Sequence, residues 1–135
     1  MNTPIRSSVI IALTCVFTTM TQAQDKPRGT PLSAAELHKM FDGGVTLEIH
    51  NPAPSDAEGV ATYRANGTAE WSWHFTKRSI VPGEDKGTWR IQGDRLCVRW
   101  EMHGQRCWRQ YRVGDNAYES WRDDEFLNLT FRVRK

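Results

Sequence analysis

The sequence predicts an all-β domain with one short N-terminal helix, arranged as a small antiparallel β-barrel or sandwich of about seven or eight strands. Short segments from residue 45 onward alternate apolar and polar side chains with the period of two that half-buried strands require. Turn-forming residues separate these segments at regular spacing, and no helical pattern lies between them. Closure into a barrel would remove the exposed edges of such a sheet.

The segment Gly87–Val113 predicts three consecutive antiparallel strands. Its first turn is the pair Gly93-Asp94, where glycine tolerates the positive φ of a two-residue hairpin loop. A turn at this point sets a register in which the large apolar residues share one face. The expected pairs are Ile91 with Leu96, Trp89 with Val98, and Gly87 with Trp100.

The second turn of this segment, at His103-Gly104, brings two cysteines together. Cys97 and Cys107 would lie opposite each other in a regular hairpin, at a Cα separation that suits a disulfide. Closing the loop between them would stabilise the fold by about 2.5–3 kcal/mol in the chain-entropy model. Both faces of this hairpin are partly apolar, so the sequence leaves open which face is the interior.

The one predicted helix spans Leu32–Phe41. Ser33 can cap its N-terminus, and Glu36 three residues later completes a capping box. Leu32 can pack against Leu37 across this first turn. The glycine pair that follows the segment ends the helix.

Further strands are expected on both sides of the central hairpins. Val45–Ile49 begins the sheet, and Asn66-Gly67 is a strong hairpin signal between two more strands. A two-residue turn there would give these pairs: Thr62 with Trp71, and Val60 with Trp73. The remaining expected elements are a polar loop over residues 77–86 and strands over residues 117–121 and 127–133.

The N-terminus has the pattern of a secretory signal peptide over residues 1–23, with Arg6 as its only charge and an apolar run over Val9–Phe17. That run is shorter than the roughly 20 residues that span a bilayer, so we expect no transmembrane span in the mature chain. Residues 24–31 are expected to form a flexible lead-in, and residues 32–135 a single β-domain. The mature protein is therefore expected to be exported, in the periplasm or outside the cell.

The net charge, the cysteines and the histidines limit which partners and cofactors we expect. The chain carries 18 Lys and Arg against 16 Asp and Glu, and so small a net charge argues against a nucleic-acid partner. Two cysteines remain in the mature chain, which in an exported protein indicates a disulfide. The histidines show no metal-ligand spacing, so neither a metal nor a cofactor is expected.

The sequence assigns no catalytic residue. It contains no G-x-S-x-G elbow, and no cysteine remains free to act as a nucleophile beside a histidine. The acidic run Asp123-Asp124-Glu125 is typical of a solvated turn, with a general acid–base pair as the alternative interpretation. We therefore expect no enzymatic activity, and an enzyme with a site that the sequence does not reveal remains the alternative.

Tryptophans and arginines are the candidates for ligand binding. A cavity in a small barrel could be lined by Trp71, Trp73 and Phe75 of one expected strand together with Trp89 and Trp100 of others, or the tryptophans could simply fill the core. Arginines crowd the central strands, where an arginine beside a tryptophan could hold an anionic or sugar-like ligand, or could only be solvated. The candidate ligand-binding residues are Trp71, Trp73, Trp89, Trp100, Arg106 and Trp108.

Three motifs carry a resemblance to a known family, namely LSAAEL at Leu32–Leu37, GTWRIQGDRLC at Gly87–Cys97 and RCWRQYR at Arg106–Arg112. Together they resemble a domain-of-unknown-function family of small exported bacterial proteins with a GTWxIxGDxLC…RC block. That resemblance implies an exported β-domain with one disulfide and brings no functional residues. A weaker resemblance, to small periplasmic inhibitors of metalloproteases, implies a lipocalin-like barrel.

The leading functional hypothesis is a non-enzymatic exported β-domain that binds a small molecule, a lipid or a component of the cell envelope. The alternative is a protein-binding inhibitor or an envelope interaction partner. An enclosed cavity bordered by the tryptophans would favour the first hypothesis. A packed interior with an exposed apolar or arginine-rich patch would favour the second.

Overall fold

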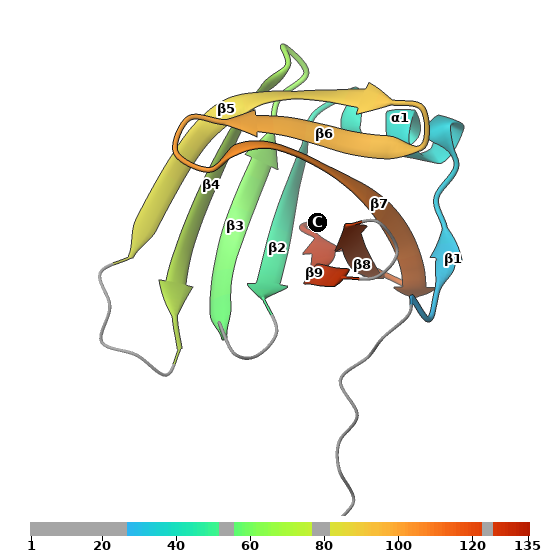
Figure 1. The fold of residues 1–135 in the computed structure, drawn as a ribbon. Helices are drawn as coiled ribbons and strands as arrows, with labels where there is room; N and C mark the ends of the chain where they lie inside the picture. Colours follow the sequence, from blue (N-terminus) through green and yellow to red (C-terminus); the bar gives the residue numbers. More distant parts are fainter. Residues whose placement is uncertain (1–26, 52–55, 77–81, 123–125) are drawn as a thin grey trace, which may run out of the picture.

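The chain forms a closed antiparallel β-barrel, seen in a computed structural model that describes residues 27–51, 56–76, 82–122 and 126–135 (Figure 1). Eight strands, β2 to β9, follow one another around the barrel in sequence order, and the pairing of β9 with β2 closes the sheet. The short strand β1 extends the sheet beside β7. The predicted all-β fold with one helix is confirmed, and of the two predicted architectures the barrel is the observed one.

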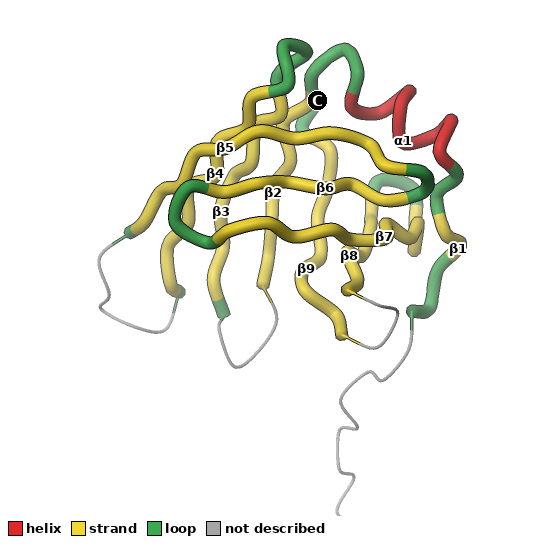
Figure 2. Tube along the Cα trace, turned by 45° about the horizontal axis from the view of Figure 1, so that its top comes forward, coloured by secondary structure: helices red, strands yellow, loops and turns green. Residues whose placement is uncertain are grey.

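Strands β5, β6 and β7 cross the barrel at a steep angle to the others and form one wall, as Figure 2 shows. The elements in chain order are β1 (Thr30–Pro31), α1 (Ala34–Phe41), β2 (Val45–Asn51), β3 (Ala57–Tyr63), β4 (Thr68–Phe75), β5 (Gly83–Gln92), β6 (Arg95–Trp100), β7 (Gly104–Gly114), β8 (Ala117–Arg122) and β9 (Phe126–Val133).

The predicted registers of the central hairpins are confirmed. Strands β5 and β6 pair around the Gly93-Asp94 turn with Gln92 opposite Arg95, and all three predicted apolar pairs are present. Strands β6 and β7 pair with Cys97 opposite Cys107, and these two residues form the predicted disulfide. The bond therefore links two adjoining strands of the same wall.

The predicted register of the β3–β4 hairpin is wrong by one residue. The observed pairs are Trp71 with Ala61 and Trp73 with Gly59, instead of Thr62 and Val60. The turn holds three residues, 65–67, because the Arg64 amide still donates to the Thr68 carbonyl at 2.8 Å. Gly67 has a φ of 84°, the left-handed conformation that closes a three-residue hairpin loop.

Helix α1 covers one end of the barrel. The Ser33 hydroxyl accepts from the Glu36 amide at 3.2 Å and the Ser33 amide donates to the Glu36 carboxylate at 2.9 Å, so the predicted capping box is present. Phe41 is fully buried, and its ring meets those of Tyr63 and Trp89 at centroid distances of 5.2 and 5.9 Å. Both views place the helix at the end that also holds the β5–β6 turn (Figures 1 and 2).

The interior face of the central strands, which the sequence left open, is the face of Leu96, Val98 and Trp100. Arg106 shares this inner face, because it lies opposite Val98 in the β6–β7 register. The disulfide lies on the outer face, since strand residues alternate between the two sides. Inward residues from other strands complete the core, including Leu47, Ile49, Ala61, Trp108 and Phe131.

Two predicted irregular segments contain strand. Thr30–Pro31, expected within the flexible lead-in, pair with β7 as β1. Strand β5 begins at Gly83, so the end of the expected polar loop over residues 77–86 belongs to the sheet. Polar composition concealed this strand, because Glu84 and Lys86 face solvent on its outer side. The predicted signal peptide, residues 1–23, and residues 77–81 of that loop lie outside the described residues.

Candidate ligand-binding site

A cavity of about 170 Å³ lies inside the barrel. Aromatic and aliphatic side chains form most of its wall, and they come from the inner faces of strands on both sides of the barrel. The lining residues used below are Trp71, Trp100, His103, Arg106, Trp108 and Gln110. Interior positions of small barrels are filled by side chains or by one small ligand, so space of this size is a candidate binding site.

The cavity opens at the end of the barrel opposite to α1. At the helix end, the packed rings of Phe41, Tyr63 and Trp89 close the interior. Among the residues that line the cavity, His103 and Arg106 are the exposed ones, and both belong to the β6–β7 hairpin. We call this end of the barrel the cavity mouth.

A buried carboxylate fixes the hairpin at the cavity mouth. The Asp85 side chain is fully buried, and it accepts hydrogen bonds from the amides of Met102 at 3.1 Å and His103 at 3.2 Å and from His103 Nδ1 at 2.6 Å. Burial raises the pKa of Asp85, but the hydrogen bonds from His103, Met102 and Lys86 outweigh it and hold the pKa below the usual 3.8. Asp85 is therefore an ionised anchor rather than a proton donor at neutral pH.

His103 is held against a cluster of indole rings. Its ring lies 5.7 Å from Trp71 and 5.5 Å from Trp73, measured between centroids. Trp71 in turn contacts Trp73 at 4.4 Å and Trp100 at 5.9 Å. The aromatic wall of the cavity thus continues to its mouth, and Asp85 positions one side of it.

Two polar atoms in the cavity wall are buried without a hydrogen-bond partner in the described part of the chain, Trp71 Nε1 and Gln110 Oε1. Gln110 is 1% exposed and lines the cavity on the inner face of β7. A buried polar group without a partner costs about 1–3 kcal/mol. Unpaired groups of this kind call for an explanation such as a bound molecule.

Of the predicted ligand-binding residues, Trp71, Trp100, Arg106 and Trp108 line the cavity. Trp73 stands beside Trp71 at the mouth, and its ring covers Gly83 so closely that a Cβ there would lie 2.2 Å from it. Trp89 lies at the helix end, where its indole N–H donates to the Arg64 carbonyl at 2.9 Å. The structure therefore brings four of the candidates to one cavity and places Trp89 apart from it.

Sequence reasoning missed three residues of this site. Gln110 could have been found, because it lies two positions after Trp108 and therefore faces inward with it. Asp85 was hidden in the expected polar loop. The role of His103 depends on Asp85, so no sequence signal marked it.

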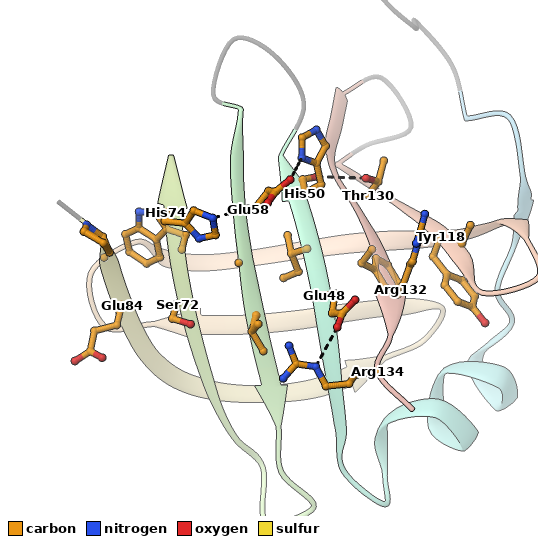
Figure 3. Close-up of a pocket in the computed structure, with 18 of the residues that line it drawn as sticks. Glu48, His50, Glu58, Ser72, His74, Glu84, Tyr118, Thr130, Arg132 and Arg134 are labelled. Carbon is orange, nitrogen blue, oxygen red and sulfur yellow. Dashed lines mark hydrogen bonds and ion pairs between the residues drawn. The ribbon is translucent and has the colours of Figure 1, made fainter. Parts of the chain in front are cut away.

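A wider, open concavity of about 1170 Å³ lies along the outer face of β2, β3, β4 and β9 (Figure 3). Several of its charged side chains pair with one another across the strands. Glu58 lies 3.8 Å from both His50 Nδ1 and His74 Nε2, and Glu48 pairs with Arg134 at 3.1 Å. Because these exposed groups already have partners, we consider the interior cavity the stronger candidate site.

No group of three or more His, Cys, Asp and Glu residues in the described part of the chain could hold a metal ion. The acidic run at residues 123–125 lies outside the described residues. No helix within the described ranges is long and apolar enough to cross a membrane.

The fold and the site define an up-and-down, lipocalin-like barrel with a small interior cavity that opens at one end. No family model, curated protein or solved structure matches the chain. The resemblance to a family of exported proteins stays a prediction. The function must therefore be inferred from the cavity and the side chains around it.

Proposed function

We propose that this protein is a non-enzymatic binding protein that holds a small molecule in the barrel cavity. One observation carries the proposal: a space of about 170 Å³ with aromatic walls, covered by α1 at one end and open at the mouth. A concave, mostly apolar site with a few convergent polar groups is the usual form of a small-molecule site.

The size of the cavity indicates which of the three hypothetical ligand classes it suits: a small molecule, a lipid or an envelope component. Sites for drug-sized ligands usually enclose about 300–1,000 Å³. An apolar cavity of about 150 Å³ holds one benzene ring. At about 170 Å³ the cavity suits a ligand of one ring better than a lipid chain or a large envelope component.

We also propose that the protein works outside the cytoplasm. The Cys97–Cys107 disulfide supports this, because disulfides persist in oxidising compartments and are rare in the cytosol. A mature chain beginning near Gln24 is expected in the periplasmic fraction or the culture medium, as read by N-terminal mass spectrometry. A full-length chain confined to the cytoplasmic fraction would contradict export.

Filling the cavity tests the binding proposal. Ala61 is 1% exposed and lines the cavity, so Ala61→Leu adds side-chain volume inside it. Benzene and toluene serve as neutral probes, followed by changes in the NMR spectrum of the labelled protein. We expect saturable binding of these probes to the wild type and loss of binding in Ala61→Leu.

Val60→Leu is the matched control, because Val60 lies next to Ala61 on the outer face of β3 and should leave probe binding unchanged. Thermal unfolding of both variants separates lost binding from lost folding. A wild type that binds neither probe, or an Ala61→Leu variant that binds them as well as the wild type does, would show that the cavity is not a ligand site.

The alternative of a protein-binding inhibitor has weaker support. Within the described ranges, the exposed large apolar side chains are Met102 and Val113, which are 72% and 42% exposed. They lie near opposite ends of β7, so they do not form one contiguous patch of the kind that marks protein interfaces.

A further inference from the structure

We infer, on the basis of the proposed function, that the ligand is an anion with a single aromatic ring. It carries a planar oxyanion such as a carboxylate at the end that faces the mouth, and a hydrogen-bond donor such as a hydroxyl at the deep end. The inference depends on three sets of side chains: aromatic rings in the middle of the cavity, one hydrogen-bond acceptor at its deep end, and hydrogen-bond donors at its mouth.

The middle of the cavity suits a flat ring. Trp71, Trp100 and Trp108 all line it, and Trp71 and Trp100 stand 5.9 Å apart between ring centroids. Aromatic pairs prefer offset or edge-to-face contacts at centroid distances of about 4.5–7 Å. A planar ring that enters this space can make such contacts with several indoles.

The deep end of the cavity presents an acceptor. Gln110 Oε1 is buried and has no partner among the described residues, and Gln110 lies further from the mouth than Trp108 on the inner face of β7. An amide oxygen accepts and cannot donate. The ligand group that reaches it must therefore carry an N–H or O–H.

The mouth presents donors. Arg106 faces inward, and its one described hydrogen bond runs from Nη1 to the Gln105 carbonyl at 2.9 Å. No carboxylate in the described ranges pairs with it, whereas other arginines of the barrel do have acidic partners: Arg64, Arg109, Arg112 and Arg134. The Trp71 indole N–H is a second donor at this end and has no partner among the described residues, and the Trp71 ring contacts His103 at the mouth.

The spacing of these groups fits one ring. Arg106, Trp108 and Gln110 are successive inward positions of β7, and strands rise about 3.4 Å per residue, so Arg106 and Gln110 are roughly 14 Å apart along the strand. Arg106 Nη1 donates to the Gln105 carbonyl and lies near Gly104, at the mouth end of this span, and Gln110 lies at the deep end. The span between them suits a ring with polar groups at opposite ends, and a guanidinium binds a carboxylate through two parallel hydrogen bonds.

Titration calorimetry with three related probes tests this inference. They are para-hydroxybenzoate, which has both polar groups, para-hydroxybenzamide, which lacks the negative charge, and benzoate, which lacks the donor. We expect the wild type to bind para-hydroxybenzoate about tenfold more tightly than either of the others, as suits one charge-assisted or one buried hydrogen bond.

Two variants test which side chain binds the carboxylate of the probe and which binds its hydroxyl. Arg106→Gln should raise the Kd for para-hydroxybenzoate about tenfold and leave the Kd for the neutral amide unchanged. Gln110→Leu should raise the Kd for para-hydroxybenzoate and leave that for benzoate unchanged. The matched control is Arg99→Gln, on the neighbouring strand and outer face, which removes the same charge away from the cavity.

The outcomes separate this inference from the proposed function. Benzene binding would show that the cavity is a ligand site. If the amide then binds as tightly as the acid, or Arg106→Gln behaves like Arg99→Gln, the inference that the ligand is an anion is wrong. If neither benzene nor any of the ring compounds binds, both proposals fail. A folded, probe-binding Gln110→Leu variant that discriminates as the wild type does would overturn the assignment of the deep end.

Discussion

Replacing Asp85 by asparagine should loosen the cavity mouth and destabilise the protein at neutral pH. The buried carboxylate accepts from Lys86 through one oxygen, from His103 through the other, and from Met102 through both. Asparagine keeps a single acceptor oxygen and turns an NH₂ group toward the remaining donors. At least one buried donor therefore loses its partner, whichever way the amide is turned.

The expected loss of unfolding free energy is about 2–3 kcal/mol. A hydrogen bond to a charged group contributes about 1.5–3 kcal/mol, and a buried donor without a partner costs about 1–3 kcal/mol. The His103 side chain is 44% exposed, so water replaces part of the hydrogen bonding that this side chain loses in the variant. We therefore expect a value well below the sum of these contributions.

The effect of this substitution should depend on pH. The pKa of Asp85 is lower in the folded protein than its usual 3.8, so its ionised form stabilises the fold above that value. That stabilisation is lost as the pH falls through the folded-state pKa. The difference between wild type and Asp85→Asn should therefore be full at pH 7 and should shrink as the solution is acidified below about pH 4.

Urea unfolding followed by tryptophan fluorescence measures these differences. Glu84→Gln is the matched control, since it removes the same charge from the adjacent, exposed position of β5. The native fluorescence of Asp85→Asn should also change, because His103 contacts Trp71 and Trp73. An Asp85→Asn variant as stable as Glu84→Gln at pH 7, or a difference that stays constant down to pH 2, would refute the anchoring role.

Three further substitutions probe other parts of the fold by the same unfolding measurement. Replacing Cys97 and Cys107 by alanine should lower the unfolding free energy by about 2.7 kcal/mol, the chain-entropy value for a sequence separation of 10. Gly83→Ala should cost about 1–3 kcal/mol and alter tryptophan fluorescence, because the new Cβ would lie 2.2 Å from the Trp73 ring. Ser33→Ala removes the helix cap and should cost about 1 kcal/mol.

Each of these predictions has an internal check. Reductant should lower the stability of the wild type to that of the double alanine variant and leave the variant unaffected. A Cβ at Gly43 would meet nothing within 4 Å, so Gly43→Ala should change the unfolding free energy far less than Gly83→Ala does. Ser72→Ala, at an exposed strand position, should cost less than Ser33→Ala. Equal effects within either pair would contradict the stated mechanism.

Local signals in the chain predicted much of the barrel. The Gly93-Asp94 turn fixed the β5–β6 register, and with it the position of Cys97 opposite Cys107, because a two-residue loop leaves one pairing. The Ser33 capping box likewise marked the start of α1. At 65–67 the same reasoning failed by one residue, since a left-handed Gly67 can close a two-residue or a three-residue loop.

The candidate site was predictable only in part. Alternation groups Trp71 with Trp73, and Arg106 with Trp108, but it does not say which side of a strand faces inward when both sides carry apolar residues. Closure of the sheet decided this, by turning Leu96 and Val98 toward the core and the disulfide outward. Trp89 resembles the other tryptophans in sequence, yet α1 covers it at the opposite end of the barrel.

By itself, the sequence determined the class of fold, the disulfide and the helix cap, because each depends on residues close together in the chain. Tertiary structure alone decided the interior face, the cavity and its mouth, and the burial of Asp85 beneath His103. These features arise where strands distant in sequence meet around a closed sheet. Their energies depend on burial and on cross-strand neighbours, which no local pattern of residues contains.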